Sequence, residues 1–152
     1  MTGVTVREAS SSELDAVYAL YRDLHDGDET ADPAALAAAK RALAASPCSR
    51  LFVADAGGEL VSSCVLFVLP NLSRGARPFG LLENVVTRRD CRNRGFGTAL
   101  LRHALACAWA ADCYKVMLLT GRTDPAVSRL YEKAGFLRGV KTGLVAYPPD
   151  TP

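Results

Sequence analysis

The chain has 152 residues, of which 49% are hydrophobic and 22% are charged, and its formal net charge at pH 7 is +2. A chain of this length can bury a sizeable core without disulfides or metals to hold it together. So small a net charge excludes a protein that is basic over its whole surface, as many nucleic-acid-binding proteins are. We therefore expect one domain over residues 1–152, no nucleic-acid partner, and only a local attraction for phosphate.

The cysteines and the N-terminal segment bear on the compartment. Five cysteines, an odd number, include no C-x-x-C pair, and only two histidines accompany them. This pattern favours reduced thiols over disulfides and makes a metal site unexpected. The N-terminal segment lacks the apolar core of a signal peptide, and the longest apolar run, CVLFVLP, is too short to span a membrane. The sequence thus predicts a cytoplasmic protein with no metal and no membrane association.

Hydrophobic periodicity predicts the elements of the first half of the chain. Residues 4–8 alternate as a strand does, and Ser10-x-x-Glu13 is a capping-box pattern that opens an amphipathic helix reaching about residue 24. A second helix begins at Asp32 and Pro33, which suit the cap and the first helical position. Two apolar runs, RLFVAD and ELVSSCVLFVL, flank AGG, which predicts a β-hairpin.

The second half alternates between strands and helices. Strands are expected over LLENVVT (81–87), over the continuously apolar KVMLLT (115–120), and over LVAY (144–147). Helices are expected over residues 95–111 and over residues 124–134, the latter ended by Gly135. The order is β-α-α-β-β-β-α-β-α-β, in which three antiparallel strands precede a right-handed parallel crossover. The fold class is therefore α/β, with a mixed sheet.

An arginine-rich turn precedes the helix at residue 95. The segment RRDCRNRGFGTALLRHAL carries four arginines in seven positions, followed by Gly95 and Gly97. A helix start offers about four unpaired N–H groups and roughly half a positive charge. Glycines let an anion approach that backbone, and arginines add charged donors. The stretch predicts a diphosphate site, although it matches neither the P-loop nor G-x-G-x-x-G/A.

Two motifs connect this stretch to a family. R-x-x-G-x-G is present at residues 92–97, directly after a strand, and RLYEKAGF (129–136) forms a helix that carries a tyrosine and ends in Gly-Phe. Together they resemble the GNAT superfamily of N-acetyltransferases, in which the first motif binds acyl-CoA. The resemblance implies a GNAT-like fold with splayed central strands. It also implies an acetyl-CoA-dependent N-acetyltransferase, in which a small-molecule primary amine attacks acetyl-CoA directly within a ternary complex.

The resemblance also implies which residues bind the co-substrate. Pantetheine would lie along the fourth strand, and the pyrophosphate would lie at the helix start. The residues carried over are Val85, Val86 and Thr87 for pantetheine, and Arg92, Asn93, Arg94, Gly95, Phe96, Gly97 and Thr98 for the pyrophosphate. Asp124 stands where relatives often carry asparagine, so a CoA contact there is in doubt.

Two residues are candidates for catalysis. Glu83 is the one carboxylate of an apolar strand, and alternation places it on the face of Val85 and Thr87. Apolar surroundings would raise its pKa and suit a general base, whereas an edge glutamate paired with an arginine is the alternative. Tyr131 stands at the position of the family's general acid, which protonates the departing thiolate, and its alternative role is core packing. Cys91 has no histidine near it in sequence and is not expected to be a nucleophile.

The acceptor stays open. Residues 23–32 hold five acidic side chains, which would suit a cationic amine or form a solvated loop. Arg74 and Arg77 would instead suit an anionic acceptor, and DCYKVMLLTG with RLYEKAGF is similar to glucosamine-6-phosphate N-acetyltransferases. A non-catalytic CoA-sensing module is the rival from another class, although such a module would not need both Glu83 and Tyr131. The resemblance is compatible with a homodimer, but no particular residue of the sequence indicates one.

Overall fold

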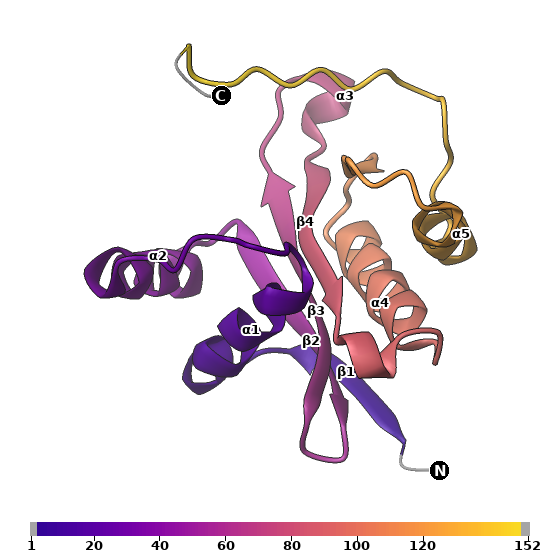
Figure 1. The fold of residues 1–152 in the computed structure, drawn as a ribbon. Coiled ribbons are helices and arrows are strands. Elements are labelled where there is room, and N and C mark those ends of the chain that lie inside the picture. The colour runs from indigo at the N-terminus through magenta and orange to yellow at the C-terminus, as the bar shows by residue number, and fades with distance from the viewer. Residues whose placement is uncertain (1–2, 150–152) are drawn as a thin grey trace.

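The computed structural model describes residues 3–149, which form a five-stranded sheet with helices on both faces (Figure 1). The strands lie side by side in the order of the chain: β1 (Val4–Glu8), β2 (Ser49–Ala56), β3 (Leu60–Leu69), β4 (Phe79–Thr87) and β5 (Val116–Met117). Neighbours from β1 to β4 are antiparallel, whereas β4 and β5 are parallel. The predicted mixed sheet is confirmed.

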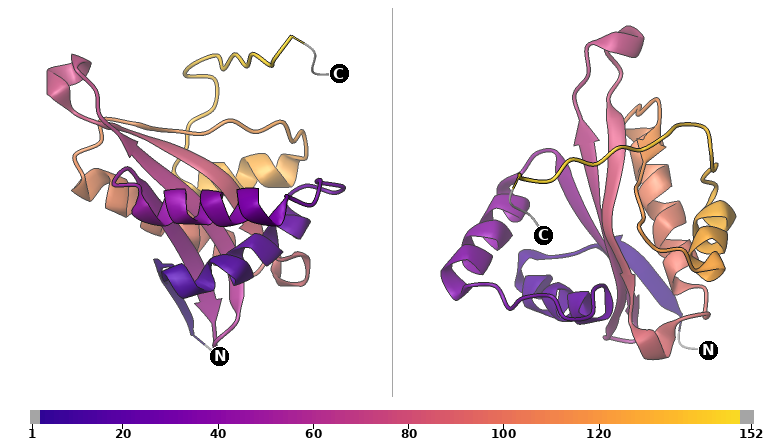
Figure 2. Two further views of the ribbon diagram at one scale, coloured as in Figure 1. Left: turned by 90° about the vertical axis from the view of Figure 1, so that its left-hand side faces the viewer. Right: turned by 45° about the horizontal axis from the view of Figure 1, so that its top comes forward.

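Helices cover the two faces of the sheet in sequence order. Figures 1 and 2 show α1 (Leu14–Leu20) and α2 (Pro33–Ala45) on one face, and α4 (Phe96–Ala110) and α5 (Pro125–Ala134) on the other. The short α3 (Ser73–Ala76) lies between β3 and β4. The predicted first helix is divided, because the 3₁₀ turns η1 (Ser11–Glu13) and η2 (Tyr21–Asp23) flank α1; a third, η3 (Arg89–Cys91), follows β4.

Local sequence signals explain where several elements begin and end. The Glu13 carboxylate accepts a hydrogen bond from the Ser10 N–H at 2.8 Å, as the capping pattern predicted. Asp32 accepts from the Ala35 N–H at 3.0 Å and so caps α2. Gly135, at φ +115°, ends α5 in the left-handed conformation that glycine adopts without strain.

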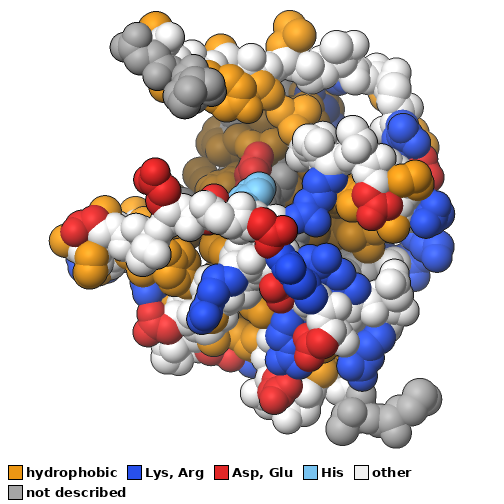
Figure 3. Space-filling model, in the orientation of Figure 1, with side chains coloured by type: hydrophobic (Ala, Val, Ile, Leu, Met, Phe, Trp, Pro, Cys, Tyr) orange, Lys and Arg blue, Asp and Glu red, His pale blue; other side chains and the backbone are white. Residues whose placement is uncertain are grey.

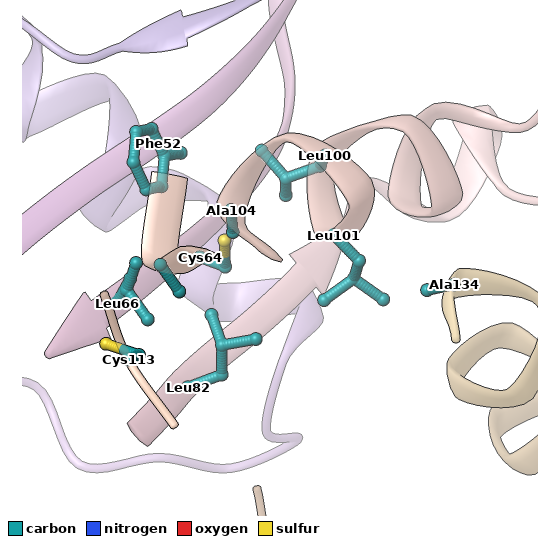
Figure 4. Packing of buried hydrophobic residues seen from close by; sticks show 10 residues of the cluster. Phe52, Cys64, Leu66, Leu82, Leu100, Leu101, Ala104, Cys113 and Ala134 are labelled. Atoms are coloured by element: carbon teal, nitrogen blue, oxygen red, sulfur yellow. The ribbon is translucent and has the colours of Figure 1, made fainter. Parts of the chain in front are cut away.

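The main core lies between the sheet and α4. Leu100 and Leu101 of α4 are fully buried against sheet residues that include Phe52, Leu66 and Leu82 (Figure 4). Buried alanines on the same helix let it approach the sheet closely. Hence the start of α4 is held rigidly beside the end of β4.

A bulge in β4 changes which face its side chains occupy. Val65 of β3 pairs with Glu83, but Ser63 pairs with Val86, so β4 contains one extra residue at this point. Asn84, at φ +52°, takes up the irregularity. Alternation is therefore shifted by one residue, and Glu83 shares a face with Val86. The expectation that Glu83 shares a face with Val85 and Thr87 was wrong, because strict alternation does not hold across a bulge.

Strands β4 and β5 separate after a short contact. β5 pairs with β4 only at Gly80–Val116 and Leu81–Met117, so the strand predicted over 115–120 shrinks to two residues. From Leu82 onward, no strand within residues 3–149 pairs with β4 on the side of β5. This is the splayed arrangement that the family resemblance implied.

The last predicted strand was wrong. Residues 144–147 are in no strand, and Leu144 and Tyr147 expose 90% and 74% of their surface. Their composition suits a strand, but a strand also needs a partner for its backbone groups, and no strand within the described residues pairs with them. Figures 1 and 2 show an extended segment that leaves α5 and crosses the molecule. Among the helices of residues 3–149, none combines the length and the apolarity needed to cross a bilayer.

Candidate active site

A cavity of about 730 Å³ lies where β4 and β5 separate. It is lined from both faces of the sheet, by η2 and the following loop on one side and by α4 and α5 on the other. Figure 3 shows the hollow in the face of the molecule seen in Figure 1, with hydrophobic side chains inside and lysine or arginine side chains near its edge. The absent β-pairing thus creates a space that passes from one layer of the molecule to the other.

Most of the residues expected at the site line this cavity. They are Glu83, Val85, Val86, Thr87, Arg92, Asn93, Gly95, Phe96, Gly97, Thr98 and Tyr131. Arg94 is the exception within the described part of the chain, because its guanidinium lies over the Phe96 ring, 5.0 Å from the centroid. The structure therefore brings together residues from β4, α4 and α5.

The start of α4 offers backbone donors to the cavity. The first bond of the helix runs from the Ala99 N–H to the Gly95 carbonyl at 3.0 Å, so the N–H groups of residues 96–98 precede the helical ladder. Gly95 has φ +86°, and a Cβ there would meet nothing within 4 Å. A Cβ on Gly97 would instead lie 3.1 Å from Thr87 Oγ1 and 3.3 Å from Leu130 Cδ1. Gly95 thus makes the turn, and Gly97 permits close packing.

The four arginines of the turn make different contacts. Arg88 pairs with Glu59 and Asp90, and Arg89 pairs with Asp23 at 3.2 Å and also with Asp26. Arg92 alone of the four lines the cavity. The four arginines do not form one anion site, because Arg88 and Arg89 form ion pairs with carboxylates of the protein.

The loop after η2 is tied across the cavity by its main chain. Arg92 donates from Nη2 to the Asp23 carbonyl at 2.9 Å and from Nε to the Thr87 carbonyl at 3.2 Å. From the opposite side, Arg122 donates to the Leu24 carbonyl. We call the contacts of Arg92 with the Asp23 carbonyl and of Arg122 with the Leu24 carbonyl the loop tether. Asp23, Leu24 and His25 consequently form part of the cavity wall.

Glu83 lies in the cavity on the face that α1 and α2 cover, and its side chain is exposed. The apolar surroundings expected from its strand are therefore missing. Within residues 3–149 it forms no ion pair, so the arginine partner of the alternative interpretation is not found there. Burial raises the pKa of the nearby Tyr21 phenol, and the Asn84 side chain acts in the opposite direction. Glu83 is left with a carboxylate that can accept a proton or a hydrogen bond from a ligand.

Tyr131 is half-buried beside the same cavity. Its ring meets that of Phe136 edge-to-face, with centroids 6.0 Å apart. Burial raises the pKa of the Tyr131 phenol, whereas the positive charge of Arg122 acts in the opposite direction. A raised pKa keeps the phenol protonated at neutral pH, which a proton donor requires. The sequence left a catalytic role and core packing as alternatives for Tyr131. In the structure its ring packs against Phe136 and also lines the cavity.

Several cavity residues had not been singled out from the sequence. Arg122, Arg129 and Lys133 line it, and the last two stand four residues apart on α5, a spacing that puts both on one side of a helix. Asp124 accepts a hydrogen bond from the Ala126 N–H at 2.8 Å, so it caps α5. This role explains how aspartate serves at a position where asparagine was expected.

Other candidates lie away from the cavity. Arg77 pairs with Asp112 at 3.0 Å, and the Arg74 guanidinium lies 5.9 Å from the centre of the Tyr114 ring. Neither lines the cavity, which argues against the acceptor-binding role considered for them. Within residues 3–149, no three side chains among histidine, cysteine, aspartate and glutamate gather closely enough to hold a metal ion.

Comparison with known proteins assigns the family. Residues 14–136 match the Acetyltransferase (GNAT) family. The chain belongs to this family. Recognition of the GNAT family from R-x-x-G-x-G and RLYEKAGF is thereby confirmed, as is the expected fold.

Individual GNAT relatives agree with the family. A solved structure from Agrobacterium tumefaciens strain C58, provisionally described as an acetyltransferase, is 41% identical, with a TM-score of 0.88 over 95% of this chain and 99% of that one. Glucosamine 6-phosphate N-acetyltransferase of Trypanosoma brucei brucei is 33% identical over 58% of this chain. A probable glucosamine 6-phosphate N-acetyltransferase of Oryza sativa subsp. japonica is 35% identical over 56%. The matches span 58% and 49% of these last two relatives' lengths.

Proposed function

We propose that this GNAT protein is an acetyl-CoA-dependent N-acetyltransferase that acetylates a primary amine of a small molecule by direct attack in a ternary complex. One observation carries the proposal. A single cavity passes through the gap between β4 and β5, with Glu83 on one side and the start of α4 and Tyr131 on the other. Acceptor and donor can therefore meet from opposite layers.

The donor has two kinds of backbone partner. The side of β4 that β5 leaves open, along Val85, Val86 and Thr87, suits the pantetheine arm, whose amides can lie there much as a neighbouring strand would. The Val86 and Thr87 carbonyls already accept from Ser62 and Arg92, respectively. The unpaired N–H groups at the start of α4 suit the diphosphate, which the helix dipole also favours. Arg92 adds a positive charge at that end.

The chemistry follows from this placement. Glu83, directly or through one water, accepts a proton from the amine, and the nitrogen lone pair attacks the thioester carbonyl carbon. Collapse of the tetrahedral intermediate forms the amide and breaks the C–S bond. Tyr131 gives its proton to the departing thiolate. The acetyl group ends on nitrogen, and CoA leaves as the thiol.

The acceptor class is proposed as a small amine, with an amino-sugar phosphate such as glucosamine 6-phosphate as the specific alternative. The names of the two partly matching relatives favour that alternative. Among cavity-lining side chains, Arg122 could contact a phosphate on the acceptor side. Polyamines are less favoured, because Asp23 and Asp26 of the acidic loop are already paired with Arg89.

A thiol-release assay tests the enzyme against the CoA-sensing module. Acetyl-CoA would be offered with glucosamine 6-phosphate, polyamines, aminoglycosides and amino acids, using wild type, Glu83→Gln and Tyr131→Phe. We expect one amine to turn over and both variants to lose about 100-fold or more in rate while binding CoA normally. CoA binding without turnover, unchanged in both variants, would identify the sensing module instead.

We also propose a homodimer. Leu144, Val145 and Tyr147 are exposed along the extended C-terminal segment, where their sequence suits a strand. A second copy would cover these side chains and pair their backbone. Light scattering after gel filtration should give twice the monomer mass, and Leu144→Ser with Tyr147→Ser should shift it toward monomer. Leu72→Ser, which alters a side chain 97% exposed elsewhere, should leave the dimer intact.

A cytoplasmic location completes the proposal. All five cysteines are unpaired, and Cys64, Cys91 and Cys113 are buried, as suits a protein kept in a reducing compartment. Cell fractionation with thiol labelling should recover the protein in the cytosolic fraction with five reduced thiols after denaturation.

A further inference from the structure

We propose that Arg129 and Lys133 of α5 form a second anion subsite in the cavity, which binds the 3′-phosphate on the ribose of the CoA donor. The inference rests on the proposed function, since it assigns part of the same ligand. It concerns two residues of RLYEKAGF to which the sequence assigned no role of their own.

The balance of charge in the cavity wall is the first observation. Arg92, Arg122, Arg129 and Lys133 line the cavity, and none of them pairs with a carboxylate within residues 3–149. Arg92 and Arg122 already donate hydrogen bonds to main-chain carbonyls: both take part in the loop tether, and Arg92 also donates to Thr87. Arg129 and Lys133 make no side-chain hydrogen bond among the described residues, so they are available to a ligand.

The position of the pair is the second observation. Leu130 lies beside Arg129 in the chain, and its Cδ1 would be 3.3 Å from a Cβ on Gly97, so this part of α5 packs on the first turn of α4. Farther along, the Lys133 carbonyl accepts a hydrogen bond from Arg102 of α4 at 3.0 Å. The two cations are therefore held on a rigid helix next to the backbone donors proposed for the diphosphate.

In the free protein the pair has one favourable feature, the place of Lys133 in the last turn of α5, where a cation suits the helix dipole. Like charges four residues apart on a helix repel one another and destabilise it. The adjacent Glu132 does not relieve them, because its only ion-pair partner among residues 3–149 is Arg138, at 3.7 Å. An anion bound between the two side chains would remove this repulsion.

The chemistry of the donor supplies such an anion. CoA carries a phosphate monoester on the ribose in addition to its diphosphate, only a few bonds away. If the diphosphate lies on the N–H groups at the start of α4, the ribose phosphate must lie close to that point. A dianionic monoester accepts several charge-assisted hydrogen bonds, which a guanidinium and an ammonium together can donate.

The test compares CoA with 3′-dephospho-CoA by titration calorimetry on the full chain. Wild type should bind CoA about tenfold or more tightly than the dephospho form, as expected for two charge-assisted contacts at an exposed site. Arg129→Gln combined with Lys133→Gln should bring the ratio of the two affinities close to one, chiefly because CoA binds more weakly. Arg138→Gln is the matched control, because it removes a cation of the same stretch that does not line the cavity, and it should keep the ratio.

Each outcome is decisive. A wild-type ratio near one, or a ratio that survives in the double variant, overturns the subsite while leaving the proposed acetyltransferase in place. Failure of wild type to bind either compound overturns the donor assignment and the subsite together. Thermal unfolding of the double variant guards against misfolding, and its midpoint should stay close to that of wild type. Competition by adenosine 3′,5′-bisphosphate should show the same loss in the double variant without involving pantetheine.

Discussion

Gly95 shows how much a single residue governs at the site. Its φ of +86° turns the chain from the arginine-rich turn into α4, and the space around its Cα is open. Any side chain would therefore fit sterically but would strain the backbone. The R-x-x-G-x-G motif needs glycine at this position for conformation rather than for room.

Gly95→Ala should lower the free energy of unfolding by about 1–2 kcal/mol, the cost of a non-glycine residue in the left-handed region. Urea denaturation followed by circular dichroism measures the change. Gly121→Ala is the matched control, because it also lines the cavity in open space but is not at positive φ. Equal midpoints for the two variants would contradict the backbone argument.

Glu13 should make the stability of the protein depend on pH in the acidic range. Arg7 donates to both of its oxygens, at 2.7 and 2.8 Å, and also to Asp55 at 2.9 Å. The Arg7 bonds, followed by the Ser10 N–H, lower the pKa of Glu13 to about 2. Because an unfolded glutamate titrates near pH ~4.3, the stabilisation is complete above that value and disappears as the pH falls toward 2.

Glu13→Gln should therefore reduce the loss of stability between pH 5 and pH 3 relative to wild type. Urea midpoints at pH 7, 5 and 3 give the comparison. Glu29→Gln provides the control, since Glu29 is exposed and forms no ion pair within residues 3–149. The idea is refuted if both variants follow the same pH dependence as wild type.

At the scale of elements, α5 depends on the residue that caps its N-terminus. Asp124 caps the helix through the Ala126 N–H and also lines the cavity. Loss of this acceptor leaves backbone donors of the first turn without a partner.

Asp124→Ala should destabilise the protein by about 1 kcal/mol, whereas Asp124→Asn should stay within a few tenths of wild type, since both amide and carboxylate cap well. Differential scanning calorimetry would separate the two. An asparagine variant as unstable as the alanine variant would show that the charge, and not the capping oxygen, matters at this position.

Elements with local determinants were predicted well, and those that depend on a neighbour were not. The starts of α2 and α5 and the end of α5 follow from Asp32, Asp124 and Gly135, which act within a few residues. The strand expected over 144–147 has suitable residues but no partner, and β5 is cut short where β4 turns away. The bulge at Asn84 could not be predicted either, because its sequence still alternates acceptably.

For the whole molecule, the interface between α4 and the sheet matters most, because it fixes both the core and the helix start. Leu101 is fully buried there. Leu101→Ala should cost about 2–5 kcal/mol, through lost burial and the cavity it leaves. Leu72→Ala, at a position 97% exposed, should cost almost nothing. Chemical denaturation of both variants makes the comparison, and a loss below ~1 kcal/mol at Leu101 would mean that this core repacks freely.

The candidate site was predictable only in part for the same reason. The motifs identified the start of α4 and Tyr131, since each is encoded in one continuous stretch. The loop tether was not predictable, because Arg92 and Arg122 reach carbonyls 69 and 98 residues away in the chain. Such contacts exist only after the sheet and both helical layers have formed.

The loop tether has a consequence for how this protein can change. Both arginines bind main-chain carbonyls, at positions 23 and 24, and every amino acid provides a carbonyl. Leu24 and His25 can therefore be exchanged while the loop stays anchored over the cavity. Natural variation, or a designed library, can therefore change the side chains of this part of the cavity wall one at a time. The main-chain contacts that hold the loop in place stay the same.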